Sequence, residues 1–300
     1  MVGVSAPGGR HRLWLTALTV LVVLTAAGTT LALLRARAPQ TKPVSPNTQA
    51  GLSYAAGVRA STARWVAREI TRGAIIACDA VMCGDLYRAG VPSASLSEIK
   101  SSAPDPFGTD VIVATPALRS VFGSRLDSEY APSILATFGH GPSQVQVRVV
   151  AADGAAAYLT ALSRDLAARK TVGDQLAGNS RIAMPSGARA QLVAGLVDPR
   201  LLLMLPALAA QHPIKVVAFF DQAPGAGPYV PLTGVELSGT DRRAGLRARA
   251  YSGWLVSFAR TQIAQFQASS ITTAHNNGRP VVFVRFSRPT PLGLIRGLAD

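Results

Sequence analysis

A long uncharged stretch near the N-terminus constrains this chain more than any other feature. Leu13 to Leu34, LWLTALTVLVVLTAAGTTLALL, contains no charged residue. At a rise of about 1.5 Å per helical residue, a run of this length can cross a hydrocarbon core about 30 Å thick. The apolar region of a signal peptide is usually shorter, about 7–15 residues. We therefore predict a retained transmembrane helix, although the small residues of Ala36-Arg37-Ala38 leave a cleaved signal peptide open.

The basic residues that flank this stretch do not settle its orientation. Arg10 and Arg12 precede it, and Arg35, Arg37 and Lys42 follow it. Because the positive-inside rule counts basic residues close to a span, the two sides are nearly balanced. The side of the membrane that holds the rest of the chain has to be inferred from the cysteines instead.

Cys78 and Cys83 are the only cysteines of the chain. Zinc sites need about four N or S ligands, often from Cys-x-x-Cys pairs, and no histidine lies near this segment. Thioredoxin-type redox pairs also have two residues between the cysteines, whereas this pair is separated by Asp79 to Met82. A metal site and a redox site are therefore disfavoured, which leaves a disulfide or two buried free thiols.

The local pattern around the cysteines allows the disulfide. Ala74 to Cys78 is an apolar run typical of a buried strand, Asp79 can cap a helix over 80–89, and Gly90 can end it. A strand-to-helix corner brings the two cysteines toward the Cα separation of about 4.4–6.8 Å that a disulfide requires. Disulfides persist in oxidising compartments. We therefore predict a disulfide, and a single-pass cell-membrane protein whose C-terminal part is extracytoplasmic.

The remainder of the chain alternates short apolar runs with helical periodicity, and hydrophobic types make up 48% of the residues. Strands are predicted at 74–78, 95–99, 110–115, 133–139, 144–151, 214–220, 232–238 and 280–286. Helices are predicted at 61–73, 80–89, 151–170, 186–198, from Pro199, and at 246–266, with a further helix starting at Pro116. This alternation indicates an α/β layered fold with a mainly parallel sheet.

The predicted organisation has five parts. A short cytoplasmic tail at 1–12 precedes the span at 13–34, and a linker covers 35–60, because Ala38 to Leu52 is rich in Pro, Gly and small polar residues. An α/β unit at 61–170 and a second one at 171–300 follow. Whether the two units share one sheet stays open.

Several short patterns carry a resemblance to a known family. They are Trp65-Val66, Cys78-Asp79, Met82-Cys83, Asp110 to Thr115, Phe122-Gly123-Ser124 and Phe138-Gly139. In these patterns the chain resembles a family of single-pass membrane proteins from high-GC actinobacteria that have no assigned activity. The resemblance extends over most of the region after the linker and implies no function.

A second resemblance concerns Asn179 to Phe219, with Val197 to Leu202 and His212-Pro213-Ile214. This segment is similar to the helical lead-in of actinobacterial proteins related to D-alanyl-D-alanine carboxypeptidase-like zinc peptidases. In those peptidases a histidine and an aspartate that bind zinc follow the lead-in. Here Ser238 stands where the aspartate would, and no histidine lies between His212 and His275. Zinc catalysis needs about three protein ligands, so no catalytic residue or metal ligand is carried over.

Positive charge is the feature that suggests a partner. Five of the 30 Lys and Arg residues precede residue 43, and the remaining 25 face all 16 acidic residues, which is a formal excess of nine positive charges. The densest cluster contains Arg242, Arg243, Arg247 and Arg249. Guanidinium groups bind phosphates and carboxylates, so these four arginines are candidate anion-binding residues. Outside the cytoplasm, the anions are lipid headgroups and wall polymers.

The sequence identifies no catalytic residue and no cofactor motif. Walker and Gly-x-Gly-x-x-Gly loops are missing, and an aromatic content of 6% disfavours nucleic-acid binding by base stacking. We therefore expect a membrane-anchored binding or scaffold protein of the cell envelope, with anionic polymers, lipid headgroups or another membrane protein as partners. The alternative is a cell-wall hydrolase, peptidase-like, with an unrecognised or degenerate active site.

Overall fold

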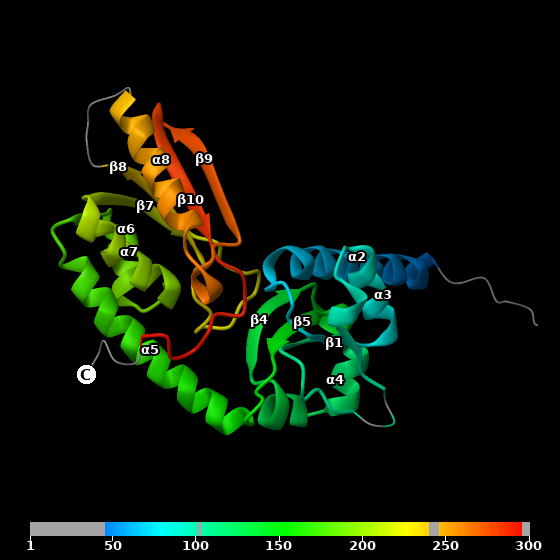
Figure 1. The fold of residues 1–300 in the computed structure, drawn as a ribbon. Helices are drawn as coiled ribbons and strands as arrows, with labels where there is room; N and C mark the ends of the chain where they lie inside the picture. The colour runs from blue at the N-terminus through cyan, green and yellow to red at the C-terminus, as the bar shows by residue number, and fades with distance from the viewer. Residues whose placement is uncertain (1–45, 101, 103, 240–245, 296–300) are drawn as a thin grey trace, which may run out of the picture. The chain divides into compact units, whose positions relative to one another are not determined.

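Two separate mixed β-sheets with flanking helices make up the fold (Figure 1). The structure, a computed structural model, describes residues 46–300 except 101, 103, 240–245 and 296–300. The predicted tail, the predicted span at 13–34 and the first part of the predicted linker therefore lie outside the described residues. Within the described residues, no helix combines the length and the hydropathy needed to cross a membrane.

The first sheet has the strand order β2-β1-β3-β5-β4. Strands β1 (Ile76–Cys78), β2 (Leu96–Glu98) and β3 (Val111–Ala114) are parallel, and β5 (Val145–Val149) runs antiparallel to both β3 and β4 (Ser133–Phe138). One face of the sheet packs against α2 (Pro46–Glu69) through Trp65 and Val66, and the other packs against α4 (Pro116–Phe122) through Leu118 and Phe122. The remaining elements here are α3 (Ala80–Arg88), the short helices η1 (Ser93–Ser95) and η3 (Gly141–Ser143), and the π-helix η2 (Leu126–Tyr130).

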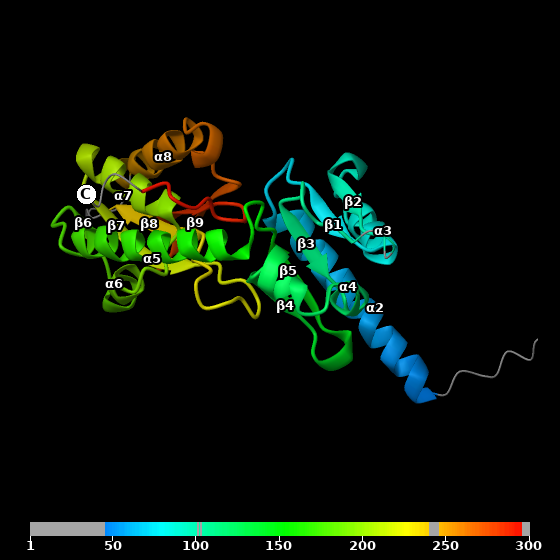
Figure 2. The same cartoon turned by 90° about the horizontal axis from the view of Figure 1, so that it is seen from below.

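The second sheet has the strand order β6-β7-β8-β10-β9, and Figure 2 labels β6, β7, β8 and β9 of it. Its strands are β6 (Ile182–Ala183), β7 (Ile214–Phe220), β8 (Gly234–Gly239), β9 (Ser270–Asn276) and β10 (Arg279–Arg285). Only β6 and β7 are parallel. One hydrophobic core joins this sheet to α5 (Ala155–Ala177), α6 (Ser186–Val193), α7 (Pro199–Gln211) and α8 (Leu246–Arg260). The short helix η4 (Ala264–Phe266) follows α8.

The predicted mainly parallel sheet is wrong, because both sheets are mixed and the second is mostly antiparallel. Parallel neighbours need a crossover of about a dozen residues or more. Between Phe138 and Val145 the chain has only a short connection with η3, and between β9 and β10 only a tight turn, so these neighbours run antiparallel. The alternation of strands and helices along a sequence does not show where a short connection makes two neighbouring strands antiparallel.

The predicted linker at 35–60 is helical from Pro46 onward, because α2 begins there. Proline is well suited to the first helical position, since its φ is already helical and its missing N–H has no intrahelical partner. Gly51 and Gly57 stand in this helix with no atom near the position of a Cβ. Both are exposed, and the buried face of α2 begins only at Val58. The linker prediction rested on the Pro, Gly and small polar residues of Ala38 to Leu52, although a single glycine costs a helix only about 1 kcal/mol.

The segment after β10 returns to the end of α2. The backbone N–H of Arg288 donates to the carbonyl of Glu69 at 2.7 Å, and the backbone N–H of Thr71 donates to the carbonyl of Arg288 at 2.7 Å. The side chain of Arg288 is only 1% exposed and donates to the carbonyls of Pro231 and Asp221. Burial lowers the pKa of Arg288, against the opposing effect of the Asp221 carboxylate. The two backbone bonds thus hold this late segment to the end of α2, and the buried Arg288 side chain holds it to Asp221 after β7 and Pro231 before β8.

Candidate functional site

Cys78 and Cys83 form a disulfide, which confirms the prediction. Cys78 is the last residue of β1, and Cys83 lies in the first turn of α3, with a Cα–Cα distance of 5.3 Å. Asp79 caps α3 as predicted, because its carboxylate accepts a hydrogen bond from the Met82 N–H at 2.9 Å. The other carboxylate oxygen accepts from the Thr115 hydroxyl. Thr115 caps α4, so this contact ties the starts of two helices together and leaves neither Asp79 oxygen without a partner.

The predicted anion-binding arginines are not brought together by any contact that the structure describes. Arg242 and Arg243 lie outside the described residues, and Arg247 belongs to α8 without a described side chain. Arg249 is exposed on the same helix. The anion site stays a prediction from the sequence.

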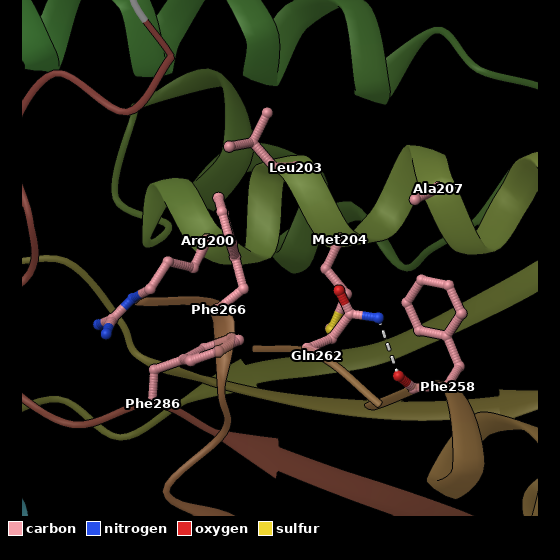
Figure 3. A pocket seen from close by; sticks show the side chains of 8 residues that line it. All are labelled: Arg200, Leu203, Met204, Ala207, Phe258, Gln262, Phe266 and Phe286. Atoms are coloured by element: carbon pink, nitrogen blue, oxygen red, sulfur yellow. Dashed lines mark hydrogen bonds between the residues drawn. The ribbon is translucent and has the colours of Figure 1, made fainter. Parts of the chain in front are cut away.

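The site that the structure does show is a cavity of about 210 Å³ in the second half of the chain (Figure 3). Helix α7 forms one wall, and the end of α8, the segment after it and the residue that follows β10 form the others. The lining residues are Arg200, Leu203, Met204, Ala207, Phe258, Gln262, Phe266 and Phe286. Three phenylalanines, a methionine and a leucine make this lining mostly apolar.

Local sequence features place these walls. Asp198 caps α7 and Pro199 occupies its first turn, so the helix starts directly before Arg200. Helix α8 ends at Arg260, and the Gln262 amide then donates to the Phe258 carbonyl at 3.0 Å. Ala264 has a positive φ of 52°, which turns the chain into η4 and places Phe266 in the lining. Gln262 thus contributes a fixed amide, and its carbonyl oxygen has no hydrogen bond from the described residues.

A buried ion pair closes one end of the cavity. Arg200 Nε and Nη2 donate to the two carboxylate oxygens of Asp198 at 2.9 and 2.7 Å, and the two side chains are 4% and 0% exposed. The guanidinium also lies over the Phe286 ring, 4.7 Å from its centre. Because Asp198 offsets the charge of Arg200, this end of the cavity is polar without being a strong anion site.

The arrangement can hold a small uncharged apolar group. An engineered apolar cavity of about 150 Å³ binds benzene, so a cavity of this size has room for a somewhat larger ring or a short branched hydrocarbon chain. Ligand sites are typically apolar pockets with a few placed polar groups. Gln262 and the Arg200–Asp198 pair are such groups at this site. Among the described residues, no group of three or more His, Cys, Asp or Glu side chains could hold a metal ion.

Sequence reasoning assigned no role to any residue of this cavity. The run PRLLLMLPALAAQ of α7 is apolar enough to be taken as core, and most of it is core. Met204 and Ala207 line the cavity because they lie opposite Phe258, Phe266 and Phe286, which are far away in the sequence. Searches with this chain against protein-family models, curated proteins and solved structures gave no match.

Proposed function

We propose that this protein is a membrane-anchored, extracytoplasmic binding protein of the cell envelope, and that the cavity beside α7 receives an apolar part of its ligand. The observation that supports binding is the cavity itself, which is lined by Met204 and three phenylalanines and is open to solvent at the exposed residue Ala207. At the rim of the cavity, the side-chain carbonyl oxygen of Gln262 can accept one hydrogen bond from a ligand. The ligand class is therefore an uncharged apolar ring or short hydrocarbon chain that carries a hydrogen-bond donor.

Photolabelling tests the proposed binding site. The full chain in membranes would be irradiated with 3-trifluoromethyl-3-phenyldiazirine, a small apolar ring, and the adducts mapped by mass spectrometry. We expect adducts in the peptides that contain Met204 and 258–266, at a higher yield than in the α5 peptide with Leu159, which is 47% exposed but lies outside the cavity. Equal yields in the two regions would contradict the proposal.

A filled cavity should lose this labelling. Ala207 lines the cavity and is exposed, so Ala207→Leu extends a side chain into the site without overpacking the core. We expect the yield at Met204 and Phe258 to fall while labelling elsewhere is unchanged. Ala190→Leu, at an exposed position of α6 outside the cavity, is the matched control and should leave all yields unchanged.

The disulfide supports the proposed location, since such bonds persist where the environment is oxidising. A membrane-impermeant maleimide applied to intact cells should label the native chain only after reduction. Val193→Cys places a thiol at an exposed position of α6, and this variant should be labelled on intact cells without reduction. A native chain that reacts on intact cells without reduction would contradict the disulfide, and a Val193→Cys variant that reacts only after lysis would place this region on the cytoplasmic side instead.

A further inference from the structure

The two described sheets protect three of their four edge strands, each in a recognisable way. Strand β2 has three residues and ends in the exposed Glu98, and β6 has only two residues. Strand β4 has an irregular register between Ile134 and Ala136. Its outer edge is also bonded to the loop after β7, since Thr137 N–H donates to the Pro224 carbonyl at 2.7 Å and the Ile134 carbonyl accepts from Gly227 N–H at 3.0 Å. Short strands, charges, bulges and covering loops are the usual means of blocking unwanted strand pairing.

The fourth edge strand, β9, has none of these protections. It has seven residues, SITTAHN, and contains no proline. With His275 neutral, it also carries no charged residue. Its register with β10 is continuous from Ser270 to Asn276. Thr272 to Asn276 are all exposed, and β10 is the only described element that shares a backbone ladder with it (Figure 1). An exposed, regular, uncharged edge of this length is a template for another strand.

The edge is also preorganised. Asn277 and Gly278 have φ values of 49° and 74° and form a two-residue turn, and Asn276 pairs directly with Arg279. Positive φ at both turn residues is characteristic of the hairpin turn that matches the twist of the strands. The Asn276 amide further donates to the Glu236 carboxylate on β8 at 2.8 Å. A partner strand would therefore bind to an edge that is already ordered, with little entropy to lose.

We infer that β9 is a self-association edge, at which a second copy of this chain pairs antiparallel about Thr273 to give one continuous sheet of ten strands. In this register Thr273 faces its own copy, Thr272 faces Ala274, and Ile271 faces His275. Threonine pairs and pairs of threonine with small residues are acceptable across antiparallel strands, and no like charges meet. The two arginines of the hairpin, Arg279 and Arg285, lie on β10, one strand behind the contact.

The sequence of the edge favours a second copy as the occupant. The chain as a whole is strongly basic, with a formal charge of +14, so an acidic partner would be expected to bind where arginines gather. Strand β9 carries no such charge. A two-fold axis through Thr273 places threonine opposite threonine and Thr272 opposite Ala274, and no charged residue faces a like charge, so the strand is compatible with its own copy in a two-fold dimer.

Cross-linking at the axis tests this contact. Opposite residues of antiparallel strands have Cα atoms about 4.5–5.5 Å apart, which suits a disulfide. Full-length Thr273→Cys in membranes should therefore form a disulfide-linked dimer on mild oxidation, and the dimer should disappear on reduction. Val193→Cys, exposed on α6, and the native chain are the controls and should stay monomeric on denaturing gels. Cross-linking of the Thr273→Cys variant no greater than that of Val193→Cys, or only to a different protein, would overturn the proposal.

Charge exchange tests the register independently of cysteine chemistry. Because Thr272 faces Ala274 of the second copy, Thr272→Lys/Ala274→Lys opposes like charges at both places, and so does Thr272→Glu/Ala274→Glu. Each variant alone should lose the dimer in light scattering of the detergent-solubilised chain, and a mixture of the two, carrying different tags, should regain it as a mixed dimer. Thermal unfolding of each variant identifies any that does not fold. Dimers that persist in a folded lysine variant, or a mixture that fails to associate while Thr273→Cys also fails to cross-link, would overturn the proposal.

Discussion

Replacing Asp198 with alanine is expected to lower the free energy of unfolding by about 3–5 kcal/mol, because it leaves a buried arginine without its counterion. Asp198 is fully buried. Its two oxygens accept from the Arg200 guanidinium and from the Arg200 N–H, and one of them also accepts from the Thr290 hydroxyl at 2.7 Å. One carboxylate therefore caps α7, neutralises Arg200 and anchors the segment after β10. All three functions are lost in the variant.

Chemical denaturation of the purified chain, followed by near-UV circular dichroism, measures this effect. Asp174→Ala is the matched control, since Asp174 is exposed on α5, and we expect a change within about 0.5 kcal/mol there. Asp198→Ala/Arg200→Met removes both charges and should recover part of the loss, because the buried unpaired guanidinium is gone. A loss in Asp198→Ala no larger than that of the control, or a double variant less stable than Asp198→Ala, would contradict this account.

Gly173→Ala should destabilise the fold by about 1–3 kcal/mol, the usual cost of overpacking a core. Gly173 is buried in α5 where that helix meets α6. A Cβ at this position would lie 2.7 Å from the Leu192 carbonyl carbon and closer still to the Leu192 carbonyl oxygen. These are backbone atoms, so they cannot rotate away as a flexible side chain could. The two helices would have to separate.

The same substitution at Gly253 provides the control. Gly253 is exposed within α8, and no atom lies within 4 Å of the position of its Cβ. Alanine there should raise the free energy of unfolding by roughly 0.5–1 kcal/mol, since it loses less backbone freedom than glycine in a helix. Denaturation curves of the two variants should therefore shift in opposite directions. A shift of both in the same direction would show that helix propensity, and not the close contact of α5 with α6, decides the effect at Gly173.

Local signals in the sequence were sufficient for the elements that they govern. Asp79 before an apolar helix predicted the cap of α3, and the strand before it predicted the corner that allows the disulfide. Pro116 and Pro199 marked the starts of α4 and α7. Each of these predictions depends on a few neighbouring residues, and the physics that decides them is equally local.

Strand β9 was missed although a local signal was present. The predicted last helix ran to Phe266, whereas α8 ends at Arg260, and no strand was expected between Phe266 and Pro280. Asn277-Gly278 is a strong hairpin signal when apolar alternation flanks it. In β9 that alternation is missing, because Thr272 to Asn276 are exposed on both faces. The feature that concealed the strand from sequence reasoning is the same one that makes it an unprotected edge.

The cavity could not be predicted, because its walls meet only through the tertiary fold. Arg200 and Asp198 are two residues apart, a spacing that does not bring side chains together on a helix, and they pair because Asp198 lies at the cap. Phe286 reaches the site from the end of β10 and Phe266 from η4. Nothing in the pattern of any one segment indicates that it faces the others.

The backbone bonds of Arg288 to Glu69 and Thr71 have a consequence for biogenesis. A ribosome delivers the end of α2 long before it delivers Arg288, and the Thr71 hydroxyl must find a carbonyl 217 positions later in the chain. Contacts between residues far apart in the sequence form late. Because the chain is synthesised from its N-terminus, the surface that they cover stays exposed until the later residues are made. A chain that stops anywhere before Arg288 would leave the end of α2 without these bonds, and unfinished copies would expose it to proteases.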